Sequence, residues 1–152
     1  MSAMSDYLEN KIIDAVFRGQ ALPTIGNTWI ALTSTPVVDS NTGTNITEIP
    51  NSGGYARVQL TSNLTNWMGT NFNQAGTISS GTNGTVSNNV AITFPSPTGS
   101  WGVANSFALL DSGTWGAGNL LFYGQLTAPK TINAGDAAPT FTANTLQIQI
   151  DN

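Results

Sequence analysis

The chain has 152 residues, of which 39% are hydrophobic, so it is long enough for one domain with a sizeable buried core. Only 8% of the residues are charged, against about 25% in an average soluble domain, and the formal net charge is −4. The four basic residues are spread along the chain at Lys11, Arg18, Arg57 and Lys130, which excludes a basic stripe for nucleic acid. A surface rich in uncharged Thr, Ser, Asn and Gly favours a protein that packs among neighbours.

Neither cysteine nor histidine occurs in the sequence. Disulfides therefore cannot stabilise the fold, and the commonest general base, the thiolate nucleophile and every serine–histidine triad are excluded. Residues 1–17 are acidic early and contain no long uncharged apolar run. We therefore expect neither a secretory signal nor a membrane-spanning segment there.

One helix is predicted at the start of the chain, over about residues 6–18. Asp6 followed by Glu9 resembles a capping box, in which side-chain oxygens satisfy free backbone N–H groups. Gly19 can adopt the left-handed conformation that ends a helix. Apolar residues recur at helical spacing and form one face: Leu8, Ile12, Ile13, Ala15, Val16 and Phe17.

The apolar face of this helix has two possible roles. It can cover one end of the β domain, or it can dock on a larger particle or on neighbouring copies, with Leu8, Ile12 and Val16 as anchors. An isolated helix of this length is marginal in water, so the face needs a partner inside or outside its own chain.

After Pro23 the apolar spacing changes from helical to alternating, which predicts strands. Gly- and Pro-rich turns separate them. The expected strands are Thr28–Thr33, Tyr55–Leu60, Val90–Phe94, Ser106–Leu110, Leu120–Leu126 and Leu146–Ile150. Alternation places Val90, Ile92, Phe94, Leu146, Ile148 and Ile150 inward, and Gln147 and Gln149 outward. The expected fold is mainly β: a β-sandwich or partial barrel of about seven to nine short strands with one N-terminal α-helix, as a single domain over residues 1–152.

Carboxylate pairs remain as a route to glycosidase-type catalysis. Three of the eight acids lie on the predicted helix, and the others lie in turns or at strand ends, where an aspartate usually caps its own backbone. The acids are Asp6, Glu9, Asp14, Asp39, Glu48, Asp111, Asp136 and Asp151. The segment Asp39–Asn45 is rich in oxygen atoms, but its glycine is out of register with an EF-hand loop. We expect no enzyme activity, no metal site and no cofactor.

The tryptophans are candidates for a sugar-stacking platform. Trp29 lies in an apolar strand and is expected in the core. Trp67, Trp101 and Trp115 fall in loops or at strand ends and are the candidate exposed aromatic residues. A carbohydrate-binding function would depend on them, although aromatic side chains in small β domains are more often core or interface residues.

Four sequence blocks in a fixed order resemble a family of small virion structural proteins of tailed phages. The blocks are SAMSDYLENKIIDAVFRG at residues 2–19, GGYARV at 53–58, NNVAITFPSPTGSWG at 88–102 and GNLLFYGQLTAPKTINAGD at 118–136. Some members resemble capsid decoration, or cement, proteins of cyanophage-type heads, and members are often labelled tail-fibre proteins. The resemblance implies a structural role in a phage particle and supplies no site residues.

Two structural roles remain open. The uncharged surface and the small size favour a capsid decoration protein, which stabilises the head shell through many weak contacts repeated over symmetric copies. The alternative is a tail-fibre or tail-associated host-adhesion module, although the repeats that build a long shaft are not visible. We expect a location in the virion after synthesis in the host cytoplasm. The expected partners are the major capsid protein or other virion proteins and further copies of the chain, but neither nucleic acid nor a membrane.

Overall fold

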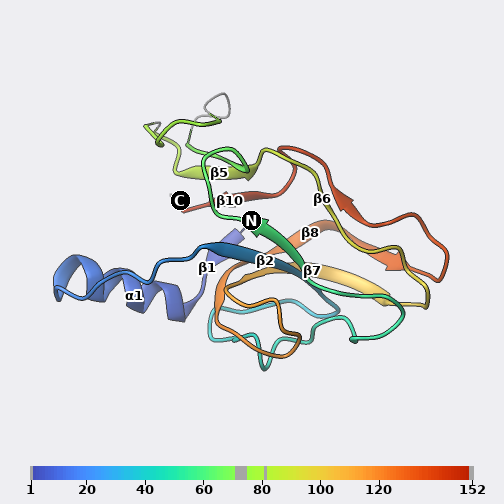
Figure 1. Ribbon diagram of the computed structural model, residues 1–152. Helices are drawn as coiled ribbons and strands as arrows, with labels where there is room; N and C mark the ends of the chain where they lie inside the picture. The colour runs from blue at the N-terminus through green and yellow to red at the C-terminus, as the bar shows by residue number, and fades with distance from the viewer. Residues whose placement is uncertain (1, 71–74, 81, 151–152) are drawn as a thin grey trace.

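The fold is mainly β with one N-terminal helix, as predicted (Figure 1). The computed structural model describes residues 2–70, 75–80 and 82–150. Over these ranges the elements are β1 (Ser2–Met4), α1 (Asp6–Phe17), β2 (Asn27–Thr33), β3 (Val58–Thr61), β4 (Trp67–Met68), β5 (Thr85–Asn88), β6 (Ile92–Thr93), β7 (Gly102–Leu110), β8 (Leu120–Ile132), β9 (Thr140–Phe141) and β10 (Gln147–Gln149). None of the sheets formed by these strands closes into a barrel, so the arrangement is sandwich-like.

The central sheet has five antiparallel strands in the order β1-β8-β7-β2-β3. Successive side chains of a strand point to opposite faces, so paired residues share a face. Ile30 of β2 lies opposite Leu109 of β7, and these residues face the main core. Ala31 lies opposite Ala108, and these residues face the other side of the sheet. The second half of β2, from Ile30 to Thr33, is therefore buried on both faces.

The main core lies between the central sheet and two small sheets, β10-β5-β4 and β6-β9 (Figure 1). Leu146 and Ile148 are each 1% exposed, and Ile92 and Phe94 are also buried, as alternation predicts. The prediction was wrong for two residues that the alternation placed inward. Ile150 is 59% exposed because it follows the end of β10, and Val90 is 36% exposed because it lies in the bend between β5 and β6.

A layer of loops covers the opposite face of the central sheet (Figure 1). Residues 34–57 join β2 to β3, and residues 111–119 join β7 to β8. A second apolar cluster lies beneath this layer: Ala31, Val37, Ala108, Leu110 and Leu120. The polar segment 34–57 makes up much of this layer and forms no strand of its own. Its conformation must therefore be fixed by specific contacts rather than by strand pairing.

The helix begins one residue earlier than the capping pattern suggests. Ser5, not Asp6, is the N-cap, and its hydroxyl oxygen accepts a hydrogen bond from the N–H of Leu8. The cause lies outside the helix: β1 pairs with β8, and the N–H of Ser5 donates to the Leu121 carbonyl at 3.1 Å. At the other end Gly19 has a φ of 67°, which confirms the predicted left-handed stop.

Candidate functional site

Helix α1 projects from the β body, and its far end is poorly covered (Figure 1). Of the predicted anchors, Leu8 is buried against its own chain at 7% exposure, Ile12 is half-buried, and Val16 is 66% exposed. Phe17 is 80% exposed and Ile13 is 48% exposed. The predicted docking face is therefore divided. Its base covers the body, and its end presents an apolar tip made of Ile13, Val16 and Phe17.

The base of α1 is fixed firmly. β1 forms three residue pairs with β8, from Ser2↔Gly124 to Met4↔Phe122. The buried Ser5 hydroxyl then donates to the Leu120 carbonyl while it caps the helix. Because a helix of 12 residues is marginal in isolation, this anchoring explains how its distal turns stay helical without packing.

The charges of α1 differ between its end and its base. Arg18 and Asp14 form an exposed ion pair at 2.8 Å near the tip. At the base, Asp6, Glu9 and Asp39 surround Tyr123. Burial raises the pKa of Tyr123, and the three negative charges raise it further. No ion pair joins these three acids to a cation within the described ranges, so the base of the helix has a negative surface.

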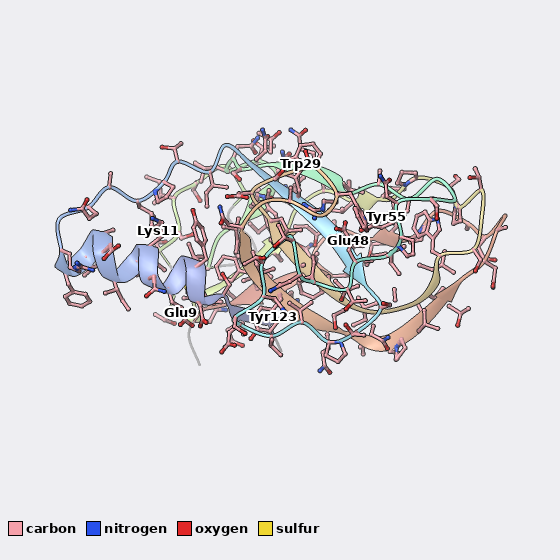
Figure 2. All side chains as sticks on the ribbon, turned by 90° about the horizontal axis from the view of Figure 1, so that it is seen from below. Glu9, Lys11, Trp29, Glu48, Tyr55 and Tyr123 are labelled. Carbon is pink, nitrogen blue, oxygen red and sulfur yellow. The ribbon has the colours of Figure 1, made fainter. Side chains whose placement is uncertain are left out.

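A buried ion pair organises the loop layer on the far face of the central sheet. The Arg57 Nη2 atom lies 2.7 Å from the Glu48 Oε2 atom, and Arg57 Nε donates to Glu48 Oε1 at 2.9 Å. The Tyr55 hydroxyl donates to the same carboxylate at 2.9 Å and accepts from the Leu32 N–H (Figure 2). Burial, reinforced by the Glu48 charge, raises the pKa of Tyr55 far above its ordinary value.

Arg57 also reaches the second loop of the layer. Its Nη1 atom donates to the Ser112 carbonyl at 2.7 Å and to the Ala117 carbonyl at 2.9 Å. One guanidinium thus joins the connection of residues 34–57 to the loop of residues 111–119, which supports a positioning role and not a reactive one. Sequence reasoning missed this network. The only signal was the placement of Tyr55 and Arg57 together on one side of an alternating segment.

The tryptophans do not form a single platform. Trp101 is 4% exposed, so its prediction as an exposed residue was wrong; its indole N–H donates to the Gly53 carbonyl inside the core at 2.7 Å. Trp115 is 46% exposed, and Trp67 is half-buried with an indole N–H that has no acceptor in the described ranges. Trp29 is also half-buried, so it is not the core residue expected.

Trp29 instead contributes to a groove of about 320 Å³ between α1 and the segment that returns to β2. Tyr7 and Lys11 line the groove from the helix, Thr24 lines it from the returning segment, and Asp111 lines it from the end of β7. The Lys11 ammonium lies 5.7 Å from the centroid of the Tyr7 ring. Figure 2 shows Lys11 on the side of α1 toward the returning segment, and Glu9 on the opposite side.

The acids considered for catalysis are engaged in turns. Asp111 accepts hydrogen bonds from the backbone and the side chain of Asn119, both at 2.7 Å. Asp136 accepts from the Asn133 N–H, and Asp39 accepts from the Ser40 N–H, each at 2.8 Å. Asp151 lies outside the described residues. Over the described ranges, acids do not gather into a group of three or more that could hold a metal ion.

The described helix is too short and too polar to cross a membrane. The structure thus combines a sandwich-like β body, a loop layer joined by a buried ion pair, and an apolar helix tip exposed on an anchored helix. Exposed apolar groups of this kind mark surfaces that contact other proteins. The family model described as Podophage GP4 fiber I protein gp80 matches residues 3–149, so the chain belongs to this family. It is thus a phage virion structural protein, as the resemblance implied. No curated protein matches the chain.

Proposed function

We propose that this chain is a non-enzymatic building block of a phage tail fibre that joins other virion proteins, or further copies of itself, through the apolar tip of α1. The family description favours the fibre alternative over the capsid decoration role that the sequence first favoured. The observation that supports an assembly role is the tip itself, where Val16 and Phe17 are 66% and 80% exposed on an anchored helix.

The energetics of the tip favour a partner. Full burial of a Val or Phe side chain stabilises a complex by about 1.5–3 kcal/mol each, before the losses of freedom on association are subtracted. The helix is already ordered by β1 and Ser5, so docking would require little further ordering of the backbone. A small, preorganised surface such as the apolar tip is suited to contacts that are individually weak and repeated over many copies.

The chain would form a module of a fibre rather than a long shaft, because its sequence has no visible repeats. Catalysis is not part of the proposal, since Asp111 and Asp136 are held by turn hydrogen bonds. Purified protein should therefore not hydrolyse polysaccharide or peptidoglycan. Turnover that disappears in an Asp111→Asn or Asp136→Asn variant would contradict this part.

Polar substitution of the tip tests the assembly role. Phage that lacks the gene is complemented with the wild-type protein, with Val16→Ser/Phe17→Ser, or with Ile78→Ser, a control at a side chain that is 81% exposed far from α1 in sequence. Deletion of residues 1–18 is a poorer test because it also removes β1 and Ser5 from the central sheet. Each purified variant is first checked for an unchanged melting temperature.

The amount of protein in purified particles is the measured quantity. We expect the tip variant to be incorporated at least tenfold less than the wild type and the control, which corresponds to about 1.4 kcal/mol of lost contact. Normal incorporation of the tip variant would refute the docking role. Electron microscopy of particles labelled on this protein then locates it: label on the tail supports the fibre, whereas label over the head shell with heat-sensitive DNA retention in its absence supports decoration.

A further inference from the structure

We propose that the groove between α1 and the segment returning to β2 is a binding site for a saccharide. This site is separate from the proposed assembly surface, because the groove is lined by other residues than those of the apolar tip. The groove has a volume of about 320 Å³. That volume corresponds to about ten water molecules at liquid density and lies at the lower end of the range for small-molecule sites.

Several polar groups that line the groove have no hydrogen-bond partner inside the described part of the chain. They are the hydroxyls of Tyr7 and Thr24, the ammonium of Lys11 and the indole N–H of Trp29. Within the described ranges the Lys11 ammonium forms no ion pair, and it lies 5.7 Å from the centroid of the Tyr7 ring. These groups come from the helix, the returning segment and the central sheet, so the fold brings distant donors and acceptors to one place.

The aromatic element of the groove is rigidly placed. Trp29 lies within β2, where it pairs with Gln59 of β3 and with Leu110 of β7. Gly113 packs directly against its ring: a Cβ atom at Gly113 would lie 2.7 Å from the Trp29 Cε3 atom. The loop therefore supports the indole from one side and holds its orientation, which is the preorganisation that a weak ligand needs.

The combination of polar and aromatic side chains in the groove indicates which class of ligand fits it. Sugar hydroxyls both donate and accept hydrogen bonds, so they match the Tyr7 and Thr24 hydroxyls, the Lys11 ammonium and the Asp111 carboxylate together. The apolar C–H face of a sugar ring packs on an aromatic side chain. A purely apolar ligand would leave the polar groups unpaired, and the Asp111 carboxylate together with the net charge of −4 disfavours a phosphate ligand.

The test uses the intact protein labelled with ¹⁵N and titrated with glucose, galactose, N-acetylglucosamine and rhamnose, followed by an array of bacterial surface oligosaccharides. The four tryptophans give indole N–H signals, which single Trp→Phe variants assign. We expect at least one sugar to shift the Trp29 indole signal and the amide signals of Tyr7 and Thr24, with dissociation constants in the millimolar range for single sugars.

Variants of the groove then establish the site. Lys11→Met and Thr24→Val should each weaken binding of that sugar about two- to tenfold, the effect of one hydrogen bond. The matched controls Lys130→Met and Thr131→Val, on exposed positions of β8, should leave it unchanged. The proposal is overturned if neither the monosaccharides nor the array bind, if the shifts centre on Trp115, or if the groove variants bind as the wild type does. Incorporation into particles is measured separately, so this outcome is independent of the assembly test.

Discussion

Replacing Arg57 by Met should destabilise the protein far more than the loss of a surface charge does. Arg57 and Glu48 have side chains that are 0% and 2% exposed, and their closest charged atoms are 2.7 Å apart. Without the guanidinium, the Glu48 carboxylate stays buried with the Tyr55 hydroxyl as its remaining donor. Removing one partner of such a pair costs about 3–5 kcal/mol, because an uncompensated charge is left in the interior.

Urea and thermal unfolding measure this loss. For a chain of this size the expected shift is a melting temperature lower by about 6–20 °C. Arg18→Met is the matched control, because Arg18 forms an ion pair of the same type and nearly the same length, 2.8 Å, with its side chain 71% exposed. That exposed pair should contribute no more than about 0.5 kcal/mol.

A double variant separates the charge from the packing. Arg57→Met/Glu48→Gln removes both charges and keeps an oxygen that can accept the hydrogen bond of Tyr55. We expect the double variant to lose less stability than the sum of the two single variants, by about 0.5–3 kcal/mol. Additive effects, or an Arg57→Met variant as stable as Arg18→Met, would refute the central role assigned to this ion pair.

Three further predictions concern the pH dependence, the core and one turn. Tyr55 stays protonated in the folded state, whereas unfolded tyrosine titrates near pH 10, so stability should fall by up to about 1.4 kcal/mol per pH unit above pH 10, and Tyr55→Phe should flatten that fall in urea titrations. Ile148→Ala should cost about 2–5 kcal/mol and Gln147→Ala little; equal costs would show that β10 is misread. Gly118→Ala should cost about 1 kcal/mol or more in thermal unfolding, since its φ is 88° and the new Cβ would lie 2.5 Å from the Ser112 Cβ; an unchanged melting temperature would contradict this.

The sequence predicts the parts of the fold that depend on local spacing. Alternation identified the inward positions Leu146 and Ile148, and Gly19 marked the end of the helix. The errors occur where a strand ends or where a distant strand intervenes. Ile150 continues the alternating pattern beyond the last paired residue of β10, and Ser5 takes the cap because β8 fixes the chain just before it.

The candidate site was less predictable because its contacts join residues far apart in the chain. The apolar periodicity of α1 identified Leu8, Ile12 and Val16, but it could not separate the covered base from the exposed tip. Local composition placed Trp101 at a turn, yet its indole donates to a carbonyl 48 positions earlier in the core. Similarly, the groove exists only because β2 brings Trp29 beside a loop that follows β7.

The way that α1 is tethered determines how the molecule would carry a pulling force. The chain enters the helix from β1 and leaves it toward β2, and both strands belong to the same five-stranded sheet, with β8 and β7 between them. Tension applied at the tip of α1 is therefore divided between two attachments, the edge strand β1 and the interior strand β2. β1 has three paired residues, whereas β2 is paired on both sides, so β1 should yield first and leave the tip connected through β2.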